Sequence, residues 1–582
     1  MASTPDHAPD EAAPPEPATP ADLDVSEFDD ADLEQWRGLA RAVLVKAGAP
    51  EDVDPVAWLT RTDLDGIAVA PLYTVDDDPG VPAVTRAPGA WDIRVRHDDP
   101  DPARANAAVL ADLEGGASSL WLRVGSGAIA PADLPRVLDG VLLDLVAVVL
   151  DADDPRAAGR ALAEVAGDTP LTGSLGVDPV AAAFRRGERD VTWTVPAPPA
   201  GLTAVTVDGT AWSDAGASDA DEIAIATATA VHHLREGGDL ADVEFRFAVT
   251  DRQFPSIAKL RAARRVWARV AELSGVDGVV QRQHAVTAAA MFSARDPWVN
   301  MLRATVAGFA AATGGADAVT VHPFDLAVGR PVVLSRRIAR NVHAILHDEA
   351  SLARVTDPAA GSWYVESLTA ALAARAWERF TAIEREGGVI AALSNGLLAD
   401  LVSATAAERE RRVATRELPL TGVSEFAHLA EQRLERDDAP GIAGLRRWAE
   451  PFERLRDRGD DALAAAGERP TVQLLALGSR GQSAARVGFA TNLFQAGGLA
   501  VDVVTDAAQC NGPVVCLCSS DSVYAEQAEA AAVAARAAGA RQVWLAGRAE
   551  VPGVDGTLFA GCDALAVLHR AWDALDATEV TA

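Results

Sequence analysis

The chain has 582 residues, of which 49% are hydrophobic, and a formal net charge of -32 at pH 7. This length exceeds one ordinary core and predicts two or three domains, while the acidic balance argues against binding to nucleic acid or to an anionic membrane surface. All four cysteines lie between Cys510 and Cys562, which leaves most of the chain without a possible disulfide and favours a reducing compartment.

The beginning of the chain shows no targeting signal. Residues 1–20 are acidic and rich in proline, with no arginine and no apolar core, so they fit neither a secretory signal nor a transit peptide. No uncharged apolar run is long enough to predict a membrane-spanning helix. We therefore expect a cytoplasmic protein with a disordered tail over residues 1–25.

Residues 26–90 are expected to form a helical arm and a lead-in to the first large domain. From Ser26 to Ala49 the apolar residues recur at helical spacing and outline one face. That face contains Phe28, Leu33, Trp36, Leu39, Ala40, Val43 and Leu44. Such an arm can wrap around a partner chain or pack on the chain's own barrel, and the pattern leaves both open.

Extended and helical segments alternate from residue 91 to residue 365. The predicted strands are residues 91–95, 119–124, 143–151, 171–177, 202–208, 243–250, 285–292 and 316–321. The helix predicted over 254–272 has the clearest pattern, because its apolar residues are spaced to form one buried face: Ile257, Leu260, Ala263, Trp267 and Val270. Eight such steps, the last ending in a helix over 334–349, predict a (β/α)8 TIM barrel whose active face lies at the C-terminal ends of its strands.

Two further regions follow the predicted barrel. Residues 366–468 are rich in Ala, Glu and Arg at helical spacing, interrupted at Pro440–Gly441, and predict a helical linker. From residue 469 to residue 582 the strand–helix alternation restarts and predicts a flavodoxin-like α/β domain. The turn from Leu477 to Gln482 joins a strand to a helix, a geometry in which backbone N–H groups can hold an anion.

Four segments of this sequence resemble methylmalonyl-CoA mutase. They are KLRAARRVWARV (259–270), RDPWVNMLRATVAGFAAATGGADAVTVHPFD (295–325), SRRIARNVHAILHDEA (335–350) and RVTDPAAGSWYVESLT (354–369). The acidic tail and the losses described below make the chain most similar to the small, or beta, subunit. The resemblance implies an enzyme that interconverts (R)-methylmalonyl-CoA and succinyl-CoA by an adenosylcobalamin-dependent radical rearrangement.

The resemblance also implies that the catalytic positions of the barrel are vacated. In WDIRVRHDD (91–99) the family's substrate-side tyrosine falls on Arg96 and its glutamine on Val95. In VTVDGTAWSDAGA (205–217) the family's pocket histidine falls on Ala211. A methyl group cannot donate a hydrogen bond to a thioester carbonyl, so we expect no catalytic residue on this chain.

The second domain departs from the family at the cofactor loop. The family's Asp-x-His-x-x-Gly motif, whose histidine coordinates the cobalt of adenosylcobalamin, is replaced around Leu477, Gly478, Ser479, Arg480 and Gly481. No histidine occurs in the sequence between His428 and His569. We therefore expect no cobalamin-binding residue here, and cobalamin bound by the partner subunit.

Together these observations predict a non-catalytic small subunit that forms a heterodimer with the large (alpha) subunit of methylmalonyl-CoA mutase and binds neither nucleic acid nor membrane. Two alternatives stay open. One is a self-sufficient cobalamin-dependent acyl-CoA mutase with relocated site residues. The other is a CoA-ester binding or regulatory module.

Weaker motifs have plainer interpretations. His343 and His347, followed by Asp348 and Glu349, stand four residues apart on a predicted helix and could bind zinc, but no third ligand is evident. Cys516 and Cys518 would face the same side of a strand, which favours small buried thiols over redox or metal chemistry. A group of arginines could bind the phosphates of coenzyme A, although an exposed, salt-linked helix face is favoured. These arginines are Arg261, Arg264, Arg265 and Arg269.

Overall fold

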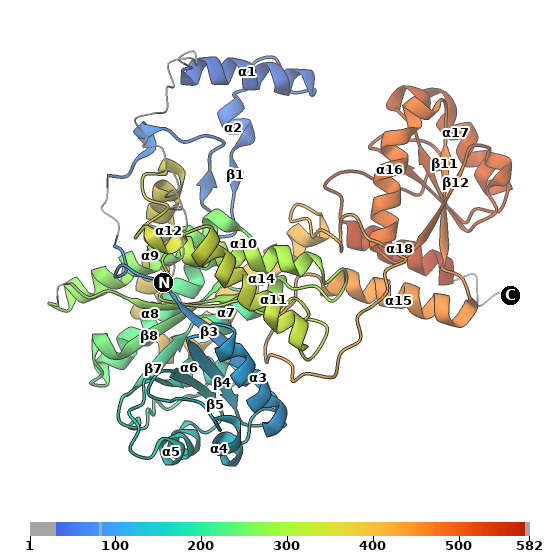
Figure 1. Ribbon diagram of the computed structural model, residues 1–582. Helices are drawn as coiled ribbons and strands as arrows, with labels where there is room; N and C mark the ends of the chain where they lie inside the picture. The colour runs from blue at the N-terminus through green and yellow to red at the C-terminus, as the bar shows by residue number, and fades with distance from the viewer. Residues whose placement is uncertain (1–30, 81–83, 277, 577–582) are drawn as a thin grey trace, which may run out of the picture. The chain divides into compact units, whose positions relative to one another are not determined.

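The computed structural model describes residues 31–80, 84–276 and 278–576 (Figure 1). The tail predicted over residues 1–25, and Phe28 of the predicted arm, lie outside the described residues. The chain divides into two compact units, one formed by Met1–Arg61 and Ala68–Leu72, the other by Thr62–Ile67 and Tyr73–Ala582.

The N-terminal unit contains α1 (Leu33–Lys46) and α2 (Pro55–Leu59), and a two-stranded sheet of β1 (Arg61–Thr62) and β2 (Ala68–Val69) follows them. Asp32 begins α1 with a reciprocal cap, because its carboxylate accepts from the Gln35 amide while the Gln35 side chain accepts from the Asp32 amide. Leu39 and Val43 are 72% and 67% exposed. The predicted helix is confirmed, and its apolar face is open at these two residues.

The larger unit contains the predicted barrel. Eight parallel strands close in the order β10-β3-β4-β5-β6-β7-β8-β9. The strands are β3 (Asp92–His97), β4 (Ser119–Val124), β5 (Ala147–Ala152), β6 (Gly173–Val177), β7 (Leu202–Asp208), β8 (Val243–Val249), β9 (Arg282–Thr287) and β10 (Ala318–Thr320). The helices around them are α3 (Pro102–Glu114), α4 (Leu134–Val137), α5 (Pro155–Ala166), α6 (Pro179–Arg185), α7 (Thr210–Ala215), α8 (Asp219–Arg235), α9 (Gln253–Leu273), α10 (Val299–Thr313) and α11 (Val333–Ala344). The TIM-barrel prediction is confirmed.

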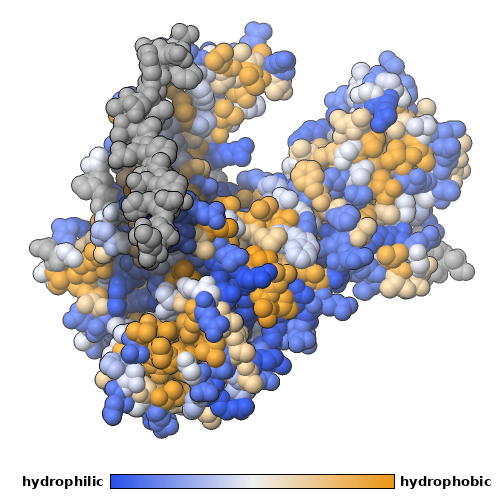
Figure 2. Space-filling model, in the orientation of Figure 1, coloured by the Kyte–Doolittle hydropathy of each residue, from blue (hydrophilic) through white to orange (hydrophobic). Residues whose placement is uncertain are grey.

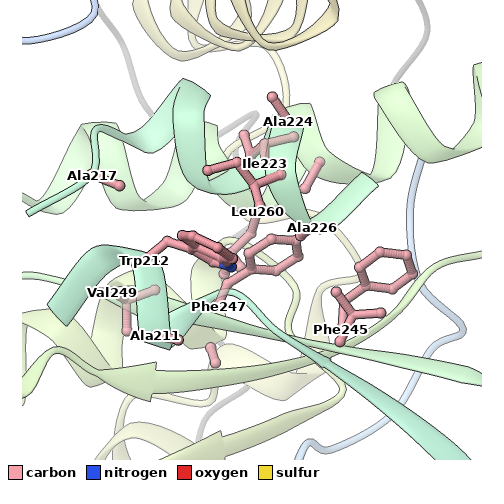
Figure 3. Close-up of a cluster of buried hydrophobic side chains, with 14 of the residues drawn as sticks. Ala211, Trp212, Ala217, Ile223, Ala224, Ala226, Phe245, Phe247, Val249 and Leu260 are labelled. Carbon is pink, nitrogen blue, oxygen red and sulfur yellow. The ribbon is translucent and has the colours of Figure 1, made fainter. Parts of the chain in front are cut away.

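Helix α9 carries the apolar face that the sequence predicts. Its five predicted core residues, Ile257 to Val270 at helical spacing, are all buried. Part of this core, with Leu260 beside Phe245 and Phe247 of β8, is drawn in Figure 3. This apolar packing holds α8 and α9 against β8 and fixes the strand's position in the barrel.

The region after the barrel differs from the helical linker predicted over 366–468. Helix α12 (Trp363–Arg385) packs against α8 and α9, so the predicted boundary cuts through a helix that belongs to the barrel. Helices α13 (Val389–Asn395), α14 (Leu397–Ala414) and α15 (Glu450–Ala466) follow, but residues 415–449 contain no α-helix. Prolines and glycines, among them Pro419 and Pro440, break the helical pattern there. This non-helical segment is held to the barrel, because Arg436 pairs with Asp325 at 2.7 Å.

The C-terminal domain has five parallel strands in the order β12-β11-β13-β14-β15, the doubly wound flavodoxin-like arrangement predicted for it. The strands are β11 (Thr471–Ala476), β12 (Ala500–Val504), β13 (Val514–Cys518), β14 (Gln542–Ala546) and β15 (Gly556–Leu558). The helices are α16 (Arg480–Ala496), α17 (Asp521–Ala537) and α18 (Ala564–Asp576). The strand order changes direction between β11 and β13, where folds of this type bind their ligands.

No single helix among the described residues is long and apolar enough to cross a membrane; α13 and α14 meet that test only as a pair, bent by 70°. Hydrophobic side chains gather on the surface over the part of the barrel that carries α4 and α5 (Figure 2). Leu142 and Leu145, between α4 and β5, are among the exposed apolar residues.

Candidate functional site

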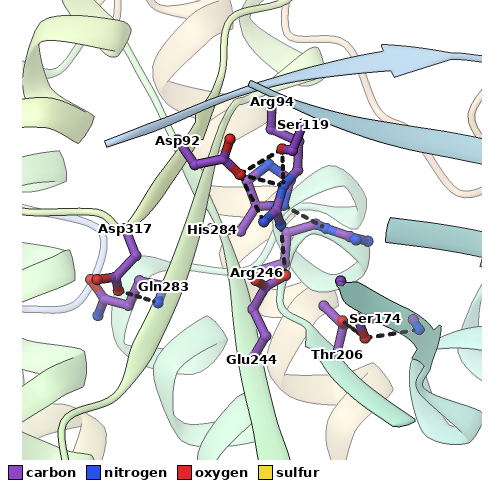
Figure 4. A network of polar contacts seen from close by, with 12 residues as sticks. Asp92, Arg94, Ser119, Ser174, Thr206, Glu244, Arg246, Gln283, His284 and Asp317 are labelled. Carbon is purple, nitrogen blue, oxygen red and sulfur yellow. Dashed lines mark hydrogen bonds and ion pairs between the residues drawn. The ribbon is translucent and has the colours of Figure 1, made fainter. Parts of the chain in front are cut away.

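The N-terminal end of the barrel interior is filled by an ion-pair network. Arg94 on β3 pairs with Asp92 at 3.1 Å and with Glu244 on β8 at 2.7 Å, and its Nε donates to Ser119 Oγ at 3.1 Å. Strands β3 and β8 are not neighbours in the barrel, so the contact from Arg94 to Glu244 crosses the interior (Figure 4). This end of the barrel is therefore closed by charged side chains that neutralise one another.

A second group of side chains fills the middle of the barrel. The guanidinium carbon of Arg246 lies 4.1 Å from the ring centre of Trp121, and His284 meets the same ring edge-on at 5.4 Å. His284 Nδ1 accepts from Arg246 Nε at 3.2 Å, so its Nε2 carries the proton that reaches Thr320 Oγ1 at 2.7 Å. Burial, with the nearby arginines, keeps the pKa of His284 well below its usual value. The middle of the barrel is a packed polar core.

The C-terminal end of the barrel opens into two small cavities. One, of about 150 Å³, is lined by Arg96, Trp121, Arg185, Asp214 and His322 together with other residues. The second, of about 280 Å³, lies beside it. Residues 438–442 of the non-helical segment line the larger cavity, and residues 441–443 line the smaller one. We call the two together the mouth cavities; they occupy the face where barrel enzymes place their active sites.

The arginines at the mouth are paired with carboxylates, and one carboxyl group there holds a proton. Burial raises the pKa of Asp214 to about 7, against the opposing effect of Arg185. Burial would raise the pKa of Asp208 as well, but Arg185, at 2.8 Å, and Arg246 hold it at about 2. Burial, with Arg96 nearby, lowers the pKa of His322 to about 3, so its imidazole is neutral.

The structure places Arg96 and Val95 at the mouth and Ala211 in the apolar core. Arg96 pairs with Asp98 at 2.8 Å and lies 5.3 Å from the ring centre of Trp121, and both Arg96 and Val95 line the larger mouth cavity. Ala211 is buried in the first turn of α7, within the apolar cluster that contains Trp212 (Figure 3). Among the described residues that line the smaller cavity, its neighbour Thr210 is present and Ala211 is not.

In the C-terminal domain, Ser479 of the loop from Leu477 to Gly481 is capped by a side chain of the helix that follows it. The Gln482 side chain accepts from the backbone amide of Ser479 at 2.9 Å and from its hydroxyl at 2.8 Å. Gly478 has a φ of 72°, which a glycine adopts without strain. This capping engages groups that would otherwise be available to an anion.

The strand ends next to this loop are also occupied. The Tyr524 hydroxyl accepts from the Ser519 amide at 2.7 Å and lies 2.8 Å from the Ala546 carbonyl, to which it can donate. Arg486 donates to the same carbonyl and pairs with Asp521 at 3.1 Å. These two side chains bridge the C-terminal ends of β13 and β14.

The predicted histidine pair is engaged in other contacts. His343 is buried, and its Nδ1 accepts from Trp91 Nε1 at 3.1 Å, while His347 pairs with Asp348 at 2.7 Å. No group of three or more residues that could hold a metal occurs among residues 31–80, 84–276 and 278–576. Cys516 and Cys518 are buried in β13, and burial raises the pKa of the Cys516 thiol well above its usual value.

Arg261 and Arg269 of α9 form the predicted ion pairs, but Arg261 and Arg264 are buried rather than exposed. Arg261 is buried and pairs with Asp357 and Glu366, and Arg264 is buried against backbone carbonyls. Helix α12 packs against α9, and Arg261 pairs with Glu366 of α12. The predicted boundary at residue 366 placed most of α12 in the linker, so this packing was not predicted. Arg269, which pairs with Glu272 at 2.6 Å, is exposed as predicted.

Sequence reasoning missed the cross-barrel network. Its signal is a run of large polar residues at alternate positions of buried strands, as in Arg94 and Arg96 of β3 or Glu244 and Arg246 of β8. Alternation places such pairs on one face of a strand. In a barrel whose outer face is covered by helices, that face is the interior.

Comparisons with known proteins agree with the fold. Residues 179–467 match the family described as methylmalonyl-CoA mutase. The methylmalonyl-CoA mutase small subunit of Streptomyces virginiae is 48% identical over 94% of this chain and 97% of its own length. That of Propionibacterium freudenreichii subsp. shermanii is 36% identical over 96% and 97%. The methylmalonyl-CoA mutase of Cereibacter sphaeroides is 27% identical over 75% and 70%. The chain therefore belongs to the methylmalonyl-CoA mutase family, and small subunits are among its relatives.

Proposed function

We propose that this chain is the non-catalytic small subunit of a heterodimeric methylmalonyl-CoA mutase. In this proposal the large (alpha) subunit binds adenosylcobalamin and the acyl-CoA substrate and interconverts (R)-methylmalonyl-CoA and succinyl-CoA. The chain described here contributes a folded surface to the complex. The names of its relatives support a larger partner, since a small subunit implies a large one.

The observation that carries the proposal is the poor fit of the C-terminal domain to cobalamin. In the family the cobalt ligand is a histidine on the loop after β11, and this sequence has no histidine between His428 and His569, which lies on α18. The loop after β11 is capped by Gln482, and Arg486 and Tyr524 occupy the adjacent strand ends. In this proposal the chain therefore binds no cobalamin.

The barrel supports the same conclusion. A self-sufficient mutase would need an acyl-CoA channel in the barrel, but Trp121, Arg246 and Arg94 fill its interior through contacts between opposite strands. At the mouth, Arg96 is paired with Asp98, and the methyl group of Ala211 lies in the apolar core. Neither can take the part of the family's tyrosine or histidine.

The surface offers apolar side chains that a partner subunit could cover. The exposed large apolar residues of the larger unit include Leu142, Leu145, Trp298, Leu302 and Phe426. Exposed apolar area of this kind marks interaction sites when it is contiguous. Figure 2 shows one such gathering over the α4 and α5 side of the barrel.

The test uses the purified chain, alone and with a methylmalonyl-CoA mutase large subunit that carries the histidine-bearing loop. We expect no shift of the adenosylcobalamin spectrum and no conversion of methylmalonyl-CoA until the second chain is added. A histidine-ligated cobalamin spectrum, or turnover by the single chain, contradicts the proposal and favours the self-sufficient mutase. Tight calorimetric binding of an acyl-CoA ester to the single chain favours the CoA-ester module.

A double variant makes this test sharper. Arg96→Tyr combined with Ala211→His restores the family's residue types at the two vacated positions of the barrel. We expect the variant alone to remain inactive, because Trp121 and Arg246 still fill the interior and the cofactor loop is unchanged. Any conversion of methylmalonyl-CoA by this variant without a partner would show that the two substitutions are the only barrier to catalysis.

A further inference from the structure

A cavity of about 680 Å³ lies beside the barrel, between α3 and α11. Residues 330–333, which lead into α11, and residues 435–437 of the non-helical segment close its rim. We call it the side cavity. Its polar wall consists of His97, Asp99, Asp112, Arg330, Arg336 and Arg340. Its volume is within the range of cavities that bind small molecules.

The inner wall of the side cavity has more cations than anions. Arg336 and Arg340 share one buried carboxylate, Asp112: Arg340 bonds to it directly, whereas Arg336 stays 3.8 Å away. Arg330 lies 3.6 Å from Asp99, whose oxygens already accept two bonds from Arg104 at 2.9 and 3.0 Å. The three arginines of this wall therefore face two carboxylates that are already engaged, whereas the whole lining, with Arg104, Arg436, Glu435 and Asp437, holds five arginines and four carboxylates.

His97 is an unpartnered buried group on the same wall. It is 1% exposed, and neither ring nitrogen has a hydrogen-bond partner among the described residues, although Nε2 lies 3.3 Å from Asp112 Oδ2. Burial, with the two arginines of α11 nearby, lowers the pKa of His97 well below its usual value, so the ring is neutral. Because a buried polar group without a partner is costly, a ligand oxygen that accepts from this ring would remove that cost.

Two of the arginines also have N–H donors that make no hydrogen bond within the described residues. The Nε of Arg340 and the Nη1 of Arg330 are buried and have no hydrogen-bond partner within the described part of the chain. The Nη1 of Arg336 reaches only the Arg96 carbonyl, at 3.4 Å. Helix α11 begins at Val333 on the rim of the cavity, and the positive end of its dipole adds to the attraction for an anion.

The alanines of α3 and residues 331–333 give the cavity an apolar lining, which we call the apolar wall, and its rim carries acidic side chains. The apolar wall consists of Ala105, Ala107, Ala108, Ala111, Pro331, Val332 and Val333. Small side chains on one wall leave a flat surface on which a planar group can lie. Glu435 and Asp437 stand on the rim, where their carboxylates can accept hydrogen bonds from amino or hydroxyl groups.

We propose that the side cavity binds a nucleotide. The phosphate groups bind Arg330, Arg336 and His97, since planar guanidinium groups recognise phosphate oxygens in pairs. The base lies against the alanines of α3, and its amino group or the ribose hydroxyls donate to the acidic rim. The side cavity shares Pro331, Arg336 and Arg340 with the larger mouth cavity. The proposed function rests on the cofactor loop and the filled barrel interior, so failure of nucleotide binding would leave that proposal intact.

The test is isothermal titration of the full-length chain with ADP and, separately, with inorganic phosphate. We expect ADP to bind and phosphate alone to bind at least tenfold more weakly. Absence of ADP binding overturns the proposal. Phosphate binding as tight as that of ADP overturns the nucleotide assignment, because the apolar wall then contributes nothing.

Variants assign the binding to this cavity. Arg336→Gln should weaken ADP binding at least tenfold, whereas Arg337→Gln, an exposed neighbour on the same helix, should leave it unchanged. Ala108→Phe keeps every arginine and fills the cavity, so it should abolish ADP binding while phosphate still binds. Equal affinity for ADP in Arg336→Gln and in the unaltered chain would place the nucleotide elsewhere, as would full affinity in Ala108→Phe.

Discussion

Replacing Trp121 by alanine tests whether the barrel interior is packed. Trp121 is 5% exposed and lies against the guanidinium of Arg246 at 4.1 Å, with His284 at its edge. Removing a buried tryptophan side chain costs about 3–5 kcal/mol, and losing a desolvated cation–π contact costs about 1–2 kcal/mol more. We therefore expect Trp121→Ala to lower the free energy of unfolding of the barrel by about 4–7 kcal/mol.

The assay has to separate the barrel from the C-terminal domain, because a chain with several domains need not unfold in one step. Hydrogen exchange of peptides from β4 and β8, followed through a urea titration, measures the barrel alone. Trp58→Ala is the matched control, because Trp58 is 57% exposed in the N-terminal unit and its loss should not change the exchange of these peptides. A loss below about 1.5 kcal/mol for Trp121→Ala would refute the reasoning and indicate an open interior.

Two further predictions concern buried charges. Lys259→Met should cost about 3–5 kcal/mol, because it leaves Glu222, with which Lys259 pairs in the core, buried without its cation. Thermal unfolding measures this, with the exposed Lys46→Met as control, and an equal melting temperature in both variants would contradict it. Burial raises the pKa of Asp214 from its usual 3.8 to about 7, so the folded state holds a proton that the unfolded state releases. This group therefore stabilises the fold below about pH 4, and the contribution is lost as the pH rises to about 7. Asp214→Asn should flatten that decline in urea midpoints measured between pH 4 and pH 7.5, whereas the exposed Asp139→Asn should leave it unchanged; a parallel decline in both variants would show that another group is responsible.

The strands were predictable where their ends are marked in the sequence. Strands β4 (Ser119–Val124) and β7 (Leu202–Asp208) match the predicted ranges residue for residue, because glycines precede each strand and inward and outward residues alternate. The strand predicted over 285–292 instead ends at Thr287, and the alanines after it form a turn of 3-10 helix. Alanine has little preference for strands. Because the apolar run continues through these alanines, the pattern does not show where the strand ends.

Contacts between segments that are far apart in the sequence could not be predicted from composition and hydrophobic spacing. The composition of residues 366–468 indicates helix except at Pro440–Gly441, but it does not reveal that α12 packs on α9 or that Arg436 ties the non-helical segment to Asp325. The same limit applies to the candidate site. The sequence identified Arg96 and Ala211 as altered positions, whereas the partners of Arg96 and the apolar surroundings of Ala211 depend on the folded barrel.

The pairing of Arg94 with Glu244 has a consequence for biosynthesis. The two residues are 150 positions apart in the chain. At about 5–20 residues per second, the ribosome needs about 8–30 s to deliver the glutamate after the arginine has emerged. During that interval Arg94 has Asp92 as a partner, but its partner across the barrel has not been made. The early half of the nascent chain should therefore stay open and depend on chaperones until β8 arrives.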